Sequence, residues 1–183
     1  QKGEAWKFFE IDPVVLRLAR DSGYFSFLAG SQASAETEII LGDARLMLQK
    51  EPDEVFDLLV LDAFSSDSIP AHLLTKEALQ LYWKKLRPSG TLVFNVSSRY
   101  FNFGPTIAAL AQASGARAFF REHNLTEEVA EKTGAAPSSW IVMLKPESPL
   151  AGDFERKQWQ LLKPGGGRIW TDDYSHVLSL FFQ

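Results

Sequence analysis

The sequence predicts an α/β fold, a doubly wound and mostly parallel sheet with helices on both faces. Short apolar segments typical of strands alternate with amphipathic helical segments along almost the whole chain. After Asp57, residues 58–61 form an apolar run that ends at Asp62, a pattern typical of a strand buried on both faces. At 183 residues, without repeats or a low-complexity linker, the chain is predicted to form a single domain over residues 1–183.

The first half of the chain contains two predicted strand–helix pairs. Residues 6–11 are rich in aromatic side chains, which favours a strand. Asp12 is a suitable helix N-cap and Pro13 fits the first helical position, so we expect a helix over residues 14–20. The second pair is a strand over residues 38–41 and a helix over residues 44–50.

The second half begins with an amphipathic helix over residues 73–86, in which apolar residues recur at helical spacing. The Arg-Pro-Ser-Gly sequence at 87–90 predicts a turn. Further strands are expected over residues 91–96, 116–120 and 140–144, and helices over 105–114 and 154–162. A polar, loop-like segment with room for one helical turn is expected over 122–137, and a last apolar segment over 177–182. A loop separates the last two strands, which favours antiparallel pairing at a sheet edge.

Composition excludes several classes of function. The net charge is −4 and there is no basic block, so we expect no nucleic-acid partner. No apolar run approaches the roughly 20 residues of a membrane span, so no membrane contact is expected from this segment. The three histidines lack metal-ligand spacing, and we expect no metal site. Cysteine is absent, so composition does not indicate a redox compartment.

Acidic residues follow three successive predicted strands: Glu10, Asp43 and Asp62. Ligands in open α/β sheets bind at the carboxyl ends of the strands, so these acids are candidate ligand contacts. Glu10 is suited to accept hydrogen bonds from a ribose diol, and Asp43 to accept one from an exocyclic amine such as that of adenine. The alternative for each acid is an ordinary turn or helix-capping role.

At this point the residues resemble a known family. The sequences Phe-Glu-Ile-Asp-Pro at 9–13, Leu-Gly-Asp-Ala-Arg at 41–45 and Leu-Asp-Ala-Phe-Ser-Ser-Asp at 61–67 are similar to those of the spermidine synthases. Leu-Arg-Pro-Ser-Gly at 86–90 and Trp-Thr-Asp-Asp-Tyr at 170–174 extend the resemblance. It implies the Rossmann-like class I S-adenosylmethionine methyltransferase fold, which these aminopropyltransferases of polyamine biosynthesis share.

The resemblance implies a role for each acid. Glu10 would hold the ribose hydroxyls of the nucleoside, and Asp43 would accept from the adenine amine with the Ala44 backbone beside it. Asp62 would be the catalytic base and amine anchor. A free alkylamine is protonated at neutral pH and becomes a nucleophile only after losing its proton, so a carboxylate beside it suits this chemistry.

Four further residues are expected on the amine side: Asp67, Tyr100, Asp172 and Asp173. The family carries an Asp-x-x-Asp-Pro pattern after the central strand, whereas here the second acid, Asp67, lies farther from Asp62. The implied co-substrate is decarboxylated S-adenosylmethionine, or S-adenosylmethionine itself, and the implied partner is a small-molecule amine. Acids at the site would repel the carboxylate of S-adenosylmethionine, which favours the decarboxylated form.

Three functions therefore remain open: aminopropyl transfer to putrescine or a similar amine, methyl transfer from S-adenosylmethionine, and a non-catalytic nucleoside-binding or inactive fragment. The family's first strand and glycine-rich loop would precede residue 1. The resemblance thus implies the C-terminal part of a longer protein, in which another element, such as a strand from a second copy, fills the gap. It also suggests a homodimer and a cytoplasmic location, as the cytosolic part of a membrane-fused protein or alone.

Overall fold

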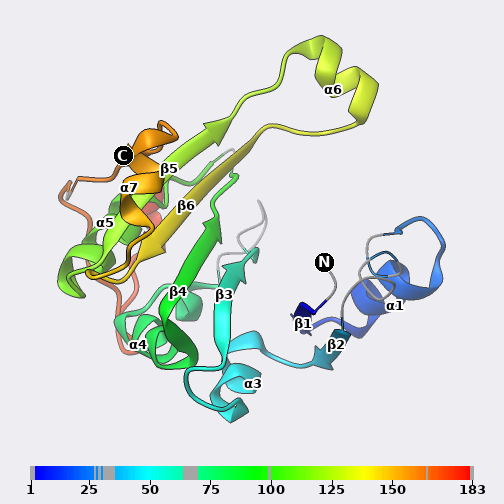
Figure 1. The fold of residues 1–183 in the computed structure, drawn as a ribbon, viewed down its shortest axis with the longest axis horizontal. Coiled ribbons are helices and arrows are strands. Elements are labelled where there is room, and N and C mark those ends of the chain that lie inside the picture. Colours follow the sequence, from blue (N-terminus) through cyan, green and yellow to red (C-terminus); the bar gives the residue numbers. More distant parts are fainter. Residues whose placement is uncertain are drawn as a thin grey trace. The chain divides into compact units, whose positions relative to one another are not determined.

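The computed structural model describes residues 3–26, 28, 30, 36–63, 70–98, 100–163 and 165–181. The chain divides into two compact units, Gln1–Glu51 (unit 1) and Pro52–Gln183 (unit 2), coloured blue to cyan and cyan to red in Figure 1. Each unit is described by itself. The single domain over residues 1–183 stays a prediction.

Unit 1 is built on two parallel strands. Strand β1 (Ala5–Glu10) pairs with β2 (Glu36–Leu41), and Glu10 lies opposite Leu41 at their carboxyl ends. Each strand leads into a helix, α1 (Pro13–Asp21) and α3 (Ala44–Lys50). As predicted, Asp12 caps α1 by accepting a hydrogen bond of 2.7 Å from the Val14 N–H, and Pro13 occupies the first turn.

Unit 2 contains a five-stranded sheet in the order β3-β4-β6-β5-β7. The strands are β3 (Phe56–Leu61), β4 (Leu86–Asn95), β5 (Arg117–His123), β6 (Ser138–Leu144) and β7 (Gln160–Leu161). The helices are η1 (Ala71–Leu73), α4 (Lys76–Lys85), α5 (Gly104–Ala113), α6 (Glu127–Thr133), α7 (Ala151–Arg156) and η2 (Val177–Leu180). β3 and β4 run parallel, whereas β6 is antiparallel to both β4 and β5.

The core of unit 2 forms where α4 and α5 pack beside β4 and β5. Its fully buried large side chains include Leu74, Leu86, Leu92, Phe94, Phe119, Ile141, Leu144 and Trp170. Far from this core, α6 lies at the end of the long arm that β5 and β6 form (Figure 1). The core therefore supports the central strands of the sheet.

The predicted α/β class is confirmed, and three local predictions are corrected. The pair β5 and β6 is antiparallel as expected, but β6 lies inside the sheet, between β4 and β5, and not at its edge. The predicted turn at 87–90 lies within β4, where the pairing register jumps: Phe56 lies opposite Leu86, but Leu58 lies opposite Thr91. These residues therefore bulge out of the β3–β4 ladder.

The helix predicted over residues 154–162 is wrong beyond Arg156, where α7 ends. Gln158 adopts a positive φ of 62°, which a continuing α-helix does not allow. Gln160 and Leu161 instead form β7 and pair with β5, so the backbone groups on that side of β5 gain partners. Pairing with the open edge of β5 thus outweighs the local helical pattern of these residues.

Candidate active site

Two parallel strands of unit 2 end at one rim of the sheet. Leu61 at the end of β3 lies opposite Phe94 in β4, so Asp62 and Asn95 come next to each other. The Asn95 amide nitrogen, Nδ2, donates a hydrogen bond of 2.7 Å to Asp62 Oδ1. The Asp62 side chain is exposed, and its Oδ2 has no hydrogen-bond partner among the residues that the structure describes. One oxygen is thus held while the other is accessible.

The orientation of Asn95 follows from its other contacts. Asn95 Oδ1 accepts hydrogen bonds from the Ser97 N–H, at 3.0 Å, and from the Ser97 hydroxyl. The Ser97 Oγ in turn accepts a hydrogen bond of 2.9 Å from the Ser139 N–H of β6. Because two donors face Asn95 Oδ1, its NH₂ group must face Asp62, which therefore acts as an acceptor. Three strands thus fix the direction of one carboxylate.

Sequence reasoning missed Asn95. The signal was available, because Asn95 ends an apolar strand in the same way as Asp62 does. Asn95 carries an amide and no charge, so a search for acids at strand ends does not find it.

Unit 1 brings Glu10 and Asp43 together at the shared end of its two strands. The Gly42 N–H donates a hydrogen bond of 2.8 Å to the Glu10 carbonyl, which ties the two strand ends to each other. Gly42 has a φ of +147°, and a Cβ there would lie only 3.0 Å from the Met47 side chain. The position therefore requires glycine, and it places the acid of β1 beside the acid that follows β2.

Glu10 and Asp43 also have the turn and helix-capping roles that the sequence offers as the alternative to ligand binding. Glu10 Oε1 accepts a hydrogen bond of 2.8 Å from the Asp12 N–H. Asp43 Oδ1 accepts one of 2.9 Å from the Leu46 N–H, which caps α3, and Ala44 is the first residue of that helix. Capping holds each carboxylate in one direction. The nucleoside contacts of Glu10, Asp43 and Ala44 stay predictions.

Three further predicted site residues, Tyr100, Asp172 and Asp173, lie in the described ranges. Asp67 falls outside the described residues. Tyr100 is exposed, and its N–H donates to Ser98 Oγ at 3.3 Å. Asp172 Oδ1 accepts a hydrogen bond of 2.7 Å from the Thr75 hydroxyl, and Asp173 is exposed in the turn that follows. The structure thus links Asp172 to the start of α4.

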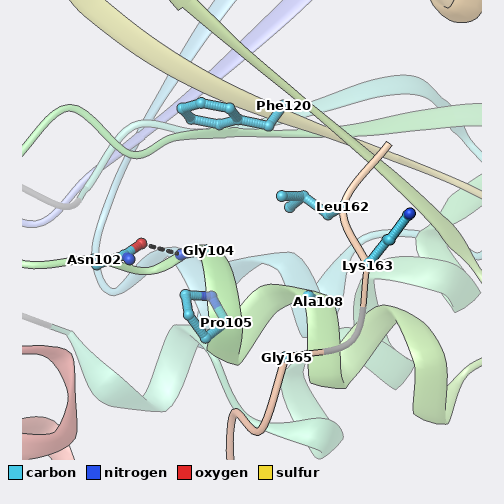
Figure 2. Close-up of a pocket in the computed structure, with 8 residues that line it drawn as sticks. All are labelled: Asn102, Gly104, Pro105, Ala108, Phe120, Leu162, Lys163 and Gly165. Carbon is cyan, nitrogen blue, oxygen red and sulfur yellow. Dashed lines mark hydrogen bonds between the residues drawn. The ribbon is translucent and has the colours of Figure 1, made fainter. Parts of the chain in front are cut away.

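A pocket of about 230 Å³ lies beside the first turn of α5 (Figure 2). Pro105 and Ala108 of α5, Phe120 of β5 and Leu162 give it apolar walls, and Asn102 lies at its margin. Asn102 Oδ1 accepts a hydrogen bond of 3.1 Å from the Gly104 N–H. The pocket contains none of the predicted site residues.

Across the described ranges, no three His, Cys, Asp or Glu side chains gather closely enough to hold a metal ion. In the same part of the chain, no helix has the length and apolar character needed to cross a bilayer.

Comparisons with known proteins agree with the sequence resemblance. No family model matches the chain. A curated polyamine aminopropyltransferase from Vibrio vulnificus is 38% identical over 91 residues, which cover 49% of this chain and 28% of that protein. The resemblance to this family is confirmed. A probable spermidine synthase from Corynebacterium glutamicum superposes with a TM-score of 0.60 at 18% identity, covering 92% of this chain and 64% of its own.

A spermidine synthase solved in complex with the transition-state analogue AdoDATO superposes with a TM-score of 0.57 at 16% identity, covering 97% of this chain and 56% of its own. Both structures show that the chain has the spermidine synthase fold. The chain spans less than two thirds of each of these relatives.

Proposed function

We propose that this chain carries the transfer site of an aminopropyltransferase. It moves the aminopropyl group of decarboxylated S-adenosylmethionine to putrescine or a similar amine and releases methylthioadenosine and a spermidine-like product. The observation that carries the proposal is the Asp62–Asn95 pair, in which the amide holds one carboxylate oxygen and the other is accessible at the rim. The similarity to a polyamine aminopropyltransferase supports the same reaction.

Asp62 acts on the acceptor amine. Its accessible oxygen binds the amine nitrogen and takes its proton, which frees the nitrogen lone pair. The nitrogen attacks the carbon next to the sulfonium, a C–N bond forms, and the C–S bond breaks with its electron pair going to sulfur. The products are a secondary ammonium ion and a neutral thioether, because the positive charge passes from sulfur to nitrogen, so the leaving group needs no metal. Asn95 keeps the carboxylate pointing along the line of attack.

Unit 1 binds the nucleoside in this proposal. Glu10 accepts from the ribose hydroxyls, Asp43 accepts from the adenine amine, and the Ala44 backbone lies beside the ring. Capping supports these roles, because a carboxylate that is already held by backbone N–H groups loses little freedom when a ligand binds. A homodimer and a cytoplasmic location stay predictions.

On the amine side, Asp67, Tyr100, Asp172 and Asp173 are proposed to surround the acceptor. Acids at this rim attract a cationic diamine and repel the carboxylate of S-adenosylmethionine. The decarboxylated co-substrate is therefore favoured over methyl transfer from S-adenosylmethionine.

Calorimetry with methylthioadenosine tests the nucleoside half. The wild-type chain should bind it, and Asp43→Ala should abolish measurable binding. Asp21→Ala is the matched control, because Asp21 lies in the same unit and pairs only with the neighbouring Arg20 at the surface, so binding should persist. A folded wild-type chain that does not bind methylthioadenosine would contradict the proposed nucleoside site.

Turnover tests the transfer half. With putrescine and decarboxylated S-adenosylmethionine, Asp62→Asn should lower kcat by about 10²–10⁴, the usual contribution of a general base. Asp57→Asn is the control, because Asp57 lies on the same strand and forms an exposed ion pair with Arg87. Transfer with S-adenosylmethionine only would favour the methyltransferase, and binding without any transfer would favour the non-catalytic alternative.

A further inference from the structure

The C-terminal part of the chain returns to the start of α4. Trp170 is fully buried, and its carbonyl accepts a hydrogen bond of 2.8 Å from the Lys76 N–H. Two residues later, Asp172 Oδ1 accepts one of 2.7 Å from the Thr75 hydroxyl, and the Asp172 N–H donates one of 3.0 Å to Glu77 Oε2. Three consecutive residues at the start of α4 thus hold the segment.

Thr75 is the centre of this contact. It is the N-cap of α4, and its Oγ1 accepts a hydrogen bond of 3.1 Å from the Ala78 N–H while donating to Asp172. Thr75 is 2% exposed, so water cannot readily replace either bond. One buried hydroxyl therefore joins the start of a helix to a segment that lies 97 positions away in sequence.

The same C-terminal segment also holds the loop that follows β4. The Asn102 N–H donates a hydrogen bond of 3.0 Å to the Leu180 carbonyl. The Phe181 ring packs edge-on against Phe101, with 4.6 Å between the ring centroids. Within this loop, Ser98 Oγ accepts from the Phe101 N–H at 3.1 Å. The loop follows directly on Asn95, the residue that orients Asp62.

We propose that residues 168–181 form a C-terminal strap that couples the start of α4 to the loop over residues 96–103, with Thr75 and Asp172 as its latch. The strap sets the position of the loop beside Asp62 and thereby the fit of the acceptor amine. Thr75 is a positioning residue, because it acts through the strap and the loop, and Asp172 is its partner in the latch. Only the kinetic part of the test rests on the proposed aminopropyl transfer.

Hydrogen exchange followed by NMR tests the coupling without any substrate. In Thr75→Val and Asp172→Ala, the Lys76 and Asn102 amides should both exchange about tenfold faster, because both variants lose the hydrogen bond between residues 75 and 172 that holds the strap. Asp172→Ala keeps the N-cap bond from the Ala78 N–H to Thr75 Oγ1, whereas Thr75→Val loses that bond as well. The Leu92 amide, in the middle of the sheet, should keep its wild-type rate. Thr75→Ser keeps the hydroxyl and Asp172→Asn keeps an acceptor, so both should restore slow exchange.

Ser175→Ala is the matched control within the strap, because Ser175 is exposed, and it should leave all these amides unchanged. Faster exchange at Lys76 alone would overturn the proposal, since the two ends would then be independent. An equal increase at Leu92 would also overturn it, because it would indicate general unfolding.

Steady-state kinetics give a second test, because a purely structural role of Thr75 would leave the KM for the amine unchanged. Thr75→Val should raise the KM for the amine about tenfold with kcat within about twofold of wild type, and Thr75→Ser should restore the KM. An unchanged KM together with released loop amides would contradict the proposed effect on the amine. If the wild-type chain shows no transfer, the proposed function fails, whereas the exchange rates still decide whether the strap couples its two ends.

Discussion

The two units follow the same local rules but differ in what they bury. In unit 2 the central strands have buried apolar side chains and two helices beside them. In unit 1, α1 has no buried residue. Exposed large apolar side chains of unit 1 are Trp6, Ile11, Val14, Val15, Leu18, Tyr24, Phe25, Leu41 and Leu46.

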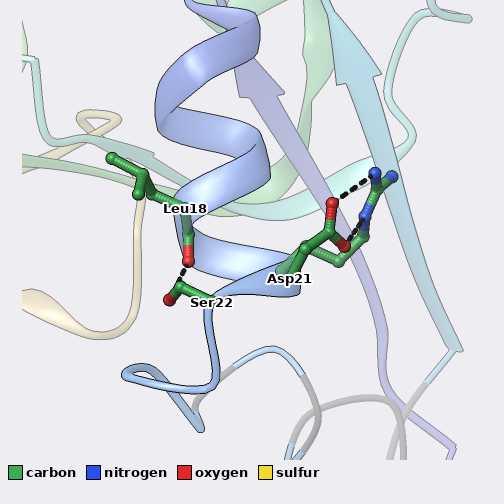
Figure 3. A network of polar contacts seen from close by, with 4 residues as sticks. Leu18, Asp21 and Ser22 are labelled. Carbon is green, nitrogen blue, oxygen red and sulfur yellow. Dashed lines mark hydrogen bonds and ion pairs between the residues drawn. The ribbon is translucent and has the colours of Figure 1, made fainter.

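Polar contacts therefore define the ends of α1. Asp12 caps its start, and Figure 3 shows its end, where the Ser22 hydroxyl donates to the Leu18 carbonyl and Asp21 pairs with Arg20. Capping and side-chain pairs contribute about 1 kcal/mol or less each, whereas most helix stability in proteins comes from packing an apolar face. The comparison teaches that local sequence signals can determine where a helix forms even when its apolar face is exposed among the described residues.

Strand β3 shows the same contrast inside unit 2. Its sequence is typical of a strand buried on both faces, yet it lies at the edge of its sheet, and Leu58 and Val60 are 42% and 46% exposed. The apolar sequence of β3 thus predicts burial, but these two side chains are exposed among the described residues.

One identical substitution in each unit tests the comparison most strongly. Leu92→Ala, at a fully buried position of β4, should lower the free energy of unfolding by about 2–5 kcal/mol, because it removes apolar contacts and leaves a cavity. Leu18→Ala, at a position of α1 that is 51% exposed, should change it by no more than about 0.5 kcal/mol. Urea denaturation measures both.

An equal loss in the two variants would break the comparison. It would mean that the apolar face of α1 is covered in solution, by a second copy or by another part of the whole protein. Repeating the Leu18→Ala measurement at several protein concentrations separates these cases, because only association makes the midpoint depend on concentration.

The second test uses acid. In unit 2, Lys85 has a side chain that is only 5% exposed, and it pairs with Asp53 at 2.8 Å. The hydrogen bond from Lys85 lowers the pKa of Asp53 below its ordinary value of 3.8. A lowered folded-state pKa contributes stability that is present above pH 3.8 and is lost as the pH falls through the folded value.

Asp53→Asn should therefore lower the midpoint of thermal unfolding at pH 7, and the difference from wild type should shrink as the pH falls below 3.8. Asp57→Asn is the control, since both partners of its ion pair with Arg87 are exposed and the midpoint should barely move. A difference between Asp53→Asn and wild type that stays constant down to pH 2 would show that the ion pair is not its source.

Much of the fold was predictable because its signals are local. Asp12 and Pro13 placed the start of α1, and the apolar spacing of residues 73–86 predicted α4. The position of β6 was not predictable, because the order of strands depends on long-range pairing that no local pattern encodes. The same holds for β7, whose residues continue a helical pattern but pair with β5.

The candidate site divides in a similar way. Acids at strand ends are visible in sequence, so Asp62, Glu10 and Asp43 could be named in advance. The Asn95 partner of Asp62 depends on the register between β3 and β4, and the contact of Asp172 with Thr75 joins residues 97 positions apart. Contacts of this kind follow from the tertiary structure, which is why sequence predicted the acids but not what holds them.

The smallest expected effect concerns the turn between the two acids of unit 1. Gly42→Ala places a Cβ at a φ of +147° and 3.0 Å from Met47, so it should cost about 1 kcal/mol and weaken methylthioadenosine binding by moving Asp43 relative to Glu10. Gly152→Ala is the control in unit 2, because Gly152 lies in α7 with only the flexible end of Arg156 near the added carbon, at 3.4 Å.

Alanine has a higher helix propensity than glycine. Gly152→Ala should therefore leave the free energy of unfolding unchanged or raise it by up to about 1 kcal/mol. Urea denaturation and calorimetry measure the two variants side by side. If Gly42→Ala keeps wild-type stability and binding, the turn has room to relax, and the positions of Glu10 and Asp43 cannot depend on it. Gly42→Ala could instead weaken methylthioadenosine binding by more free energy than it takes from unfolding. That result would show that unit 1 is ordered where the nucleoside is proposed to bind, even though α1 has no buried residue.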